Sequence, residues 1–238
     1  MKKIAILILT FVMSAQISFS QFGEIGKSKE LSLEVHGKYT TPITKRQLTE
    51  AKLIKDLIQG YPINWISKYV SVEIIGSLNG KKIITHSKDG NLNSEQMNLL
   101  SNVDIASNIF INVNYLYDQK VGHQIEKNVI NYSCTVVPDK EAAFAGGYNQ
   151  LIIFLKENAV NKIPANVATK MQVAKLRFTI DEAGWVEKPS LVKTTGDLKT
   201  DNLILKAIQQ MPQWLPAKNE KGNHVKQEFE FVLGNFGC

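Results

Sequence analysis

Cysteine is scarce in this sequence. Cys134 and Cys238 are the only two among 238 residues, so one disulfide bridge is the most that the chain can form. That bridge would tie the end of the chain back onto an earlier module, and it requires an oxidising compartment. The alternative is a buried Cys134 and a free, exposed Cys238. The choice depends on a distance that a sequence does not give.

Positive charge is present but is not concentrated. The formal net charge is +6, yet the lysines are scattered and alternate with acidic residues. Nucleic-acid binding needs a clustered basic face, and the chain has only short basic pairs, so we predict no nucleic-acid partner. These pairs are Lys2-Lys3, Lys45-Arg46 and Lys81-Lys82. Hydrophobic residues at 44% and charged residues at 21% are ordinary for a globular protein and indicate neither a disordered nor a polytopic membrane protein.

Residues that could carry catalysis form no recognisable motif. The histidines have no metal-ligand spacing and no cysteine pair beside them. Gly146-Gly147 lacks the Lys-Ser/Thr of a phosphate loop, and Asp181 and Glu182 fall in a turn. We therefore predict no enzyme, no catalytic residue, no metal and no cofactor. The histidines are His36, His86, His123 and His224.

Residues 1–20 have the parts of a secretory signal peptide. Two lysines follow Met1, an apolar stretch runs from Ile4 to Met13, and Ser18-Phe19-Ser20 places small residues before a cut at Gln21. The apolar stretch is shorter than the roughly twenty residues that span a bilayer as a helix. We predict a cleaved signal peptide and an exported protein. The alternative is an uncleaved inner-membrane anchor over residues 4–19.

The remaining chain predicts an α+β protein of two small modules, the first over residues 30–137. Thr44 is placed to cap a helix, with Gln47 completing a capping box. Gly60-Tyr61-Pro62 would end that helix. The apolar stripe of the helix consists of Leu48, Ala51, Ile54 and Ile58.

Strand patterns follow in the first module. Alternation over residues 70–75 predicts a strand, and Asn79-Gly80 predicts a tight hairpin to a partner strand over residues 81–87. A short helix opens at Ser94. Two further strands are expected near residues 109–117 and 129–137, before a linker at residues 138–141.

The second module begins with a helix over residues 148–158. Alternating apolar residues over 174–180 predict a strand, Asp181 to Gly184 a hairpin loop, and residues 186–193 the returning strand. Pro189 places that strand at a sheet edge, because proline has no N–H to donate.

A second helix and a last strand complete this module. Thr200 or Asp201 would cap the helix, and Pro212 ends it. Trp214 is expected to pack over the helix end. Alternation over residues 225–233 then predicts the last strand.

Two family resemblances emerge from these patterns. The first module is similar to the repeated C-terminal domains of the gliding-motility and secretion protein GldM, on the segments Pro42-Ile43-Thr44-Lys45-Arg46-Gln47-Leu48 and Asn91-Leu92-Asn93-Ser94-Glu95-Gln96. The second, over residues 141–234, resembles the C-terminal domain of TonB energy transducers of the Bacteroidetes type. Its motifs are Phe144-Ala145-Gly146-Gly147-Tyr148 and Met211-Pro212-Gln213-Trp214-Leu215-Pro216-Ala217, followed by a strand with two phenylalanines.

The TonB resemblance implies a three-stranded antiparallel sheet with helices on one face. It also implies a periplasmic protein that grips a short segment of an outer-membrane TonB-dependent receptor, linked to transmembrane transport; another envelope subunit is the alternative partner. The last strand would lie at a sheet edge and accept the segment as an added strand. This predicted peptide-binding edge consists of Val225, Lys226, Gln227, Glu228, Phe229, Glu230, Phe231 and Val232. The outward charges Lys226, Glu228 and Glu230 are equally consistent with guarding that edge against aggregation.

Two features depart from a working energy transducer. The prolines are scattered and form no long spacer, and a folded module stands in the spacer's place. We therefore expect an adaptor, associated with a membrane only through its partners unless the N-terminal segment is retained. The alternative is a structural subunit of a gliding or secretion apparatus, as the first module implies.

Overall fold

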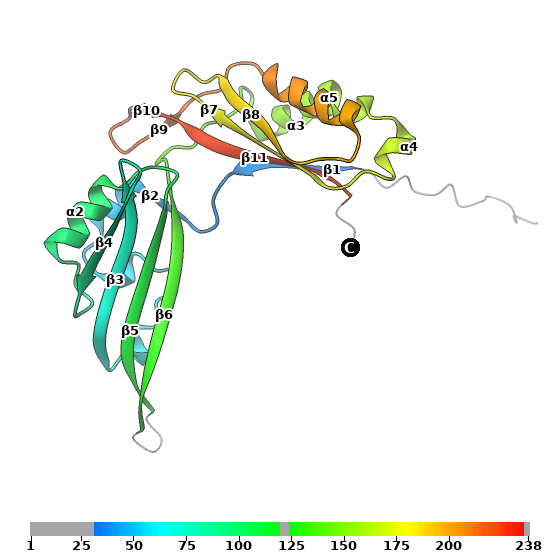
Figure 1. The fold of residues 1–238 in the computed structure, drawn as a ribbon. Helices are drawn as coiled ribbons and strands as arrows, with labels where there is room; N and C mark the ends of the chain where they lie inside the picture. Colours follow the sequence, from blue (N-terminus) through cyan, green and yellow to red (C-terminus); the bar gives the residue numbers. More distant parts are fainter. Residues whose placement is uncertain (1–30, 120–123, 236–238) are drawn as a thin grey trace, which may run out of the picture. The chain divides into compact units, whose positions relative to one another are not determined.

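The computed structural model describes residues 31–119 and 124–235 and has an α+β fold with two main β-sheets (Figure 1). The predicted signal peptide, the alternative anchor and Cys238 lie outside the described residues. Within the described ranges, no helix is long and apolar enough to cross a membrane.

The N-terminal sheet has five strands in the order β2-β6-β5-β3-β4. All neighbours are antiparallel except β2 and β6. The strands are β2 (Pro42–Thr44), β3 (Lys68–Leu78), β4 (Lys81–Ser87), β5 (Asn108–Gln119) and β6 (Gln124–Val137). Asn79 and Gly80 have φ of 51° and 73°, as the predicted two-residue hairpin requires.

Four short helices lie in the described part of this region, and all but the third contribute buried residues to the core of the sheet. They are α1 (Lys45–Glu50), η1 (Ile54–Asp56), η2 (Ile63–Trp65) and α2 (Ser94–Asn102). Thr44 and Gln47 form the predicted capping box. The expected first helix is shorter than its apolar stripe suggested, because the chain leaves the helix at Ala51 and Leu53 bridges to Asn91. The stripe is nevertheless buried: Leu48, Ala51, Ile54 and Ile58 all enter the core.

The C-terminal sheet has four strands in the order β1-β11-β7-β8, all antiparallel. They are β1 (Ser32–Gly37), β7 (Ala174–Ile180), β8 (Val186–Lys193) and β11 (Gln227–Gly234). The predicted three strands are present, and β1 adds a fourth from the other end of the sequence. A small ribbon of β9 (Ala217–Lys218) and β10 (His224–Val225) precedes β11.

Helices cover one face of the C-terminal sheet (Figure 1). They are α3 (Gly147–Asn158), η3 (Val160–Lys162), α4 (Ala165–Ala168) and α5 (Leu198–Gln209). Helix α5 begins earlier than predicted, because Asp197 and not Thr200 or Asp201 caps it. Asp201 instead accepts hydrogen bonds from Thr194 and Thr195.

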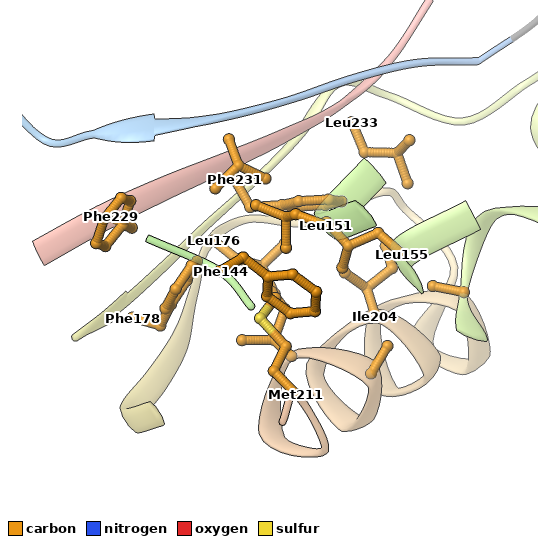
Figure 2. Close-up of a cluster of buried hydrophobic side chains, with 14 of the residues drawn as sticks. Phe144, Leu151, Leu155, Leu176, Phe178, Ile204, Met211, Phe229, Phe231 and Leu233 are labelled. Carbon is orange, nitrogen blue, oxygen red and sulfur yellow. The ribbon is translucent and has the colours of Figure 1, made fainter. Parts of the chain in front are cut away.

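A single apolar core joins this sheet to its helices. Figure 2 shows Phe229, Phe231 and Leu233 following one another along β11, with the side chains of α3 and α5 gathered nearby. Trp214 is buried, as expected, with its ring centroid 5.5 Å from that of Phe144 and 5.1 Å from that of Phe229. These contacts hold β11 against the helices of its sheet.

Candidate functional site

The last strand, β11, is an interior strand of its sheet. It pairs with β7 from Gln227 to Leu233 on one side and with β1 from Phe229 to Gly234 on the other. The prediction that Val225–Val232 lies at a sheet edge is therefore wrong, because this strand has a neighbour on each side. The sequence pattern identified the strand correctly, but alternation within a strand carries no information about a neighbour almost two hundred residues away in the chain.

Strand β1 occupies the place that an added peptide would take on β11. Leu33, Val35 and Gly37 lie opposite Leu233, Phe231 and Phe229, which face the core. Leu31 and Val35 are buried and belong to that core, and Leu33 packs against it. The alternate residues Ser32, Glu34 and His36 are exposed and lie on the other face. The strand thus has the alternating apolar pattern of a strand-addition ligand.

Main-chain geometry shows which groups of β1 bind β11. The N–H of Lys38 donates to the carbonyl of Glu228 at 3.0 Å. In antiparallel pairing, hydrogen-bonded pairs alternate with non-bonded pairs along the strand. Counting back from Lys38, the main-chain groups of His36 and Glu34 also bond to β11, whereas those of Val35 and Leu33 point away from it. The side chain of Lys38 adds an ion pair to Glu228 at 2.6 Å.

Glu230 lies among positive charges in the middle of β11. Its carboxylate is 2.8 Å from Nζ of Lys175 and 3.2 Å from Nε of Arg177, and the residue is 8% exposed. Burial acts to raise the pKa of Glu230, but hydrogen bonds and charges from Lys175 and Arg177 outweigh it and hold the pKa below its usual value. Glu230 therefore joins two strands and is not the exposed edge charge that the sequence suggested.

Lys226 precedes β11 and is exposed, as predicted. Its ammonium lies 2.8 Å from Glu187 and 3.9 Å from Glu182. The hydrogen bond that Lys226 donates to the carboxylate of Glu187 is the largest of the influences that raise the pKa of Lys226. These contacts join the start of β11 to the β7–β8 hairpin, so Lys226 already has partners within the domain.

The opposite edge of the sheet, β8, is poorly suited to accept another strand. The strand order places β8 at an edge, as the missing N–H of Pro189 predicted. Lys188 has φ of 49°, and the pairing with β7 shifts register between Arg177 and Thr179. A proline, a bulge and a lysine are the usual means of protecting an edge strand. The side of β11 that β1 covers is therefore the better acceptor for an added strand.

A cavity of about 320 Å³ lies beside the end of β1. Its walls are mainly apolar and aromatic, and Figure 2 shows three of them: Phe144, Leu151 and Phe229. The complete lining is Val35, His36, Gly37, Tyr39, Glu141, Ala142, Ala143, Phe144, Tyr148, Leu151, Trp214 and Phe229.

Tyr39 closes one side of this cavity. Its hydroxyl donates a hydrogen bond of 2.9 Å to Oε1 of Glu141. Burial, followed by this hydrogen bond and the charge of Glu141, raises the pKa of Tyr39 to about 12. Tyr39 is therefore neutral and acts as a hydrogen-bond donor across the physiological range.

Sequence reasoning missed β1 and the cavity. The alternation of Leu31, Leu33 and Val35 is a strand signal that the sequence contains, but it does not identify β11 as the partner. Among the described residues, no group of three or more His, Cys, Asp or Glu side chains could hold a metal ion. Cys134 is buried and its thiol is free.

Residues 148–233 match the model of the protein family described as TonB C terminal. The match runs from α3 into β11 and includes neither β1 nor the N-terminal sheet. It confirms the resemblance inferred for the second module and gives no support to the GldM resemblance of the first. No curated protein and no solved structure matches the chain.

Proposed function

Residues 148–233 form a TonB C-terminal domain, a protein-interaction domain of the cell envelope, and on this premise we propose that it binds an extended segment of another envelope protein as a strand added to β11. The segment would replace β1 and pair with Phe229–Gly234, a range that includes Phe229, Glu230, Phe231 and Val232 of the predicted binding residues. The partner is an outer-membrane TonB-dependent receptor or another envelope subunit, and the site of action is the periplasm. In the receptor case, the protein takes part in transmembrane transport.

The observation that supports this proposal is the docking of β1. A segment remote in sequence from β11 pairs with it in antiparallel register and places alternate apolar side chains against the core. A partner segment with the same alternation would make the same main-chain bonds. The protected edge at β8 leaves this side of the sheet as the better acceptor.

The energetics of β1 are compatible with exchange. Ordering the seven residues from Leu31 to Gly37 costs about 7–14 kcal/mol of backbone entropy. Burial of Leu31 and Val35 contributes about 3–6 kcal/mol, and roughly one net hydrogen bond per paired residue contributes about 3–9 kcal/mol. The two sides of this balance are similar in size. A segment with larger apolar side chains can therefore compete with β1.

Photocrosslinking in intact cells tests the proposal. A photoreactive amino acid at Val232, on the outer face of β11 opposite Glu34, would lie beside an incoming strand. We expect an adduct with an extended segment of an envelope protein, identified by mass spectrometry. The same group at Ser190, on the protected strand β8, is the matched control and should give no such adduct. Equal adducts at both positions, or none at Val232 in correctly folded protein, would argue against strand addition to β11.

A further inference from the structure

The side chains that β1 presents to the core become smaller along the strand. Leu33, Val35 and Gly37 occupy successive core-facing positions, opposite Leu233, Phe231 and Phe229. Gly37 has no side chain to place against Phe229. At this last core-facing position, β1 pairs with β11 but places no side chain against the core.

The cavity lies at this position. Gly37 and its cross-strand neighbour Phe229 both line it, together with Phe144, Leu151 and Trp214. Its volume of about 320 Å³ is roughly twice that of an engineered apolar cavity of about 150 Å³ that admits benzene. The space is thus large enough for an aromatic side chain.

Tyr39 covers the cavity while β1 is docked. A Cβ added at Gly37 would collide with the ring of Tyr39 and lie 3.2 Å from Nε2 of Gln227. The N–H of Tyr39 donates to the carbonyl of Gly37 at 3.0 Å, so a tight turn holds the ring there. Because only one residue separates Tyr39 from the end of β1, displacement of the strand would also remove this ring and free the carboxylate of Glu141 to accept another hydrogen bond.

We infer that this cavity is a specificity pocket for a tyrosine of the partner segment, at the position that Gly37 holds in β1. The inference rests on the proposed strand addition to β11. The ring of the incoming tyrosine would pack between Phe144 and Phe229, and its hydroxyl would donate to the carboxylate of Glu141 in place of Tyr39. The partner segment is therefore an extended peptide with apolar residues at alternate positions and a tyrosine at the last of them.

Two synthetic peptides test the pocket on the full chain. One has the sequence of residues 31–38, and the other is identical except for Gly37→Tyr. Their binding is measured by fluorescence anisotropy of a label at the peptide N-terminus. We expect the tyrosine peptide to bind at least about tenfold more tightly, since an aromatic side chain becomes buried. A third peptide with Gly37→Phe should fall between the two, because it lacks the hydroxyl.

Two protein variants separate the pocket from the strand pairing. Ala143→Leu places a larger side chain in the cavity lining while leaving the main-chain bonds between Ala143 and Leu215 in place. It should reduce the preference for tyrosine over glycine to about one and leave binding of the glycine peptide unchanged. Glu141→Gln should reduce the preference for tyrosine over phenylalanine.

The outcomes distinguish this inference from the function on which it rests. If both peptides bind equally to the unmodified protein, the inferred tyrosine pocket is wrong, while the proposed strand addition to β11 is supported. If neither peptide binds and the Val232 adduct is also missing in cells, the proposed function fails and the pocket inference fails with it. A tyrosine preference that survives Ala143→Leu would place the tyrosine elsewhere and overturn the pocket.

Discussion

Replacing Glu230 by glutamine tests whether β11 lies inside the sheet. The substitution keeps the size of the side chain but removes the charge that Lys175 and Arg177 contact from the neighbouring strand. An interior Glu230 stabilises the fold through these contacts, whereas an exposed edge charge would contribute almost nothing. The side chains of Lys175 and Arg177 are 38% and 42% exposed, so solvent screens part of the interaction. We expect a loss of about 1–2 kcal/mol in the free energy of unfolding.

Urea unfolding, followed by tryptophan fluorescence, measures this loss. Glu228→Gln is the matched control, because Glu228 lies on the same strand but its ion pair with Lys38 joins two side chains that are more than 40% exposed. The control should lose less than about 0.5 kcal/mol. Equal effects of the two substitutions would refute the interior position of Glu230.

The pH dependence gives a second test of the same residue. The pKa of Glu230 is lower in the folded protein than its usual value, so its stabilisation is present above the ordinary carboxyl pKa. The contribution is lost as the pH falls through the lowered pKa, because both the folded and the unfolded protein then bind the proton. The stability difference between the native protein and Glu230→Gln should therefore shrink in acid. A difference that is constant with pH would contradict the electrostatic explanation.

Two further predictions concern buried residues. Phe231→Ala should reduce the free energy of unfolding by about 3–5 kcal/mol, because Phe231 is fully buried at the centre of β11; urea unfolding checks this, and a loss below about 1 kcal/mol would show that the site is not packed. The thiol of Cys134 should react with thiol reagents only when the protein unfolds, since burial raises its pKa to about 12. Mass spectrometry of modified peptides checks this, and rapid labelling of Cys134 in the folded protein would contradict it.

The local structure of this protein could be predicted well from sequence. The capping box of Thr44 and Gln47, the Asn79-Gly80 hairpin and the edge position of Pro189 each depend on neighbouring residues and on simple backbone rules. Two local predictions were wrong: the helix expected to continue past Ala51 ends there, and Asp197, not Thr200 or Asp201, caps α5. Beyond Ala51 an irregular segment follows, and it still buries the apolar side chains of the expected helix.

The candidate site could be predicted only in part. The pattern of β11 identified the acceptor strand, but the strand that covers it, Ser32–Gly37, pairs across almost the whole length of the chain. Such long-range pairing leaves no trace in the periodicity of either strand. The cavity was equally hidden, because it arises where Gly37 meets Phe229 and where Tyr39 folds back over both.

Locking β1 onto β11 is the measurement that tests the central claim most directly. Leu33 and Leu233 form a non-hydrogen-bonded pair, whose Cα atoms are about 4.5 Å apart in antiparallel sheets and within the range of a disulfide. Cysteines at both positions, in a Cys238→Ser background, give a protein whose oxidised and reduced forms differ only in the lock. Strand replacement predicts that the Gly37→Tyr peptide binds the reduced form and not the oxidised form. Equal binding to both forms would show that the peptide does not replace β1 and would contradict the proposed mechanism.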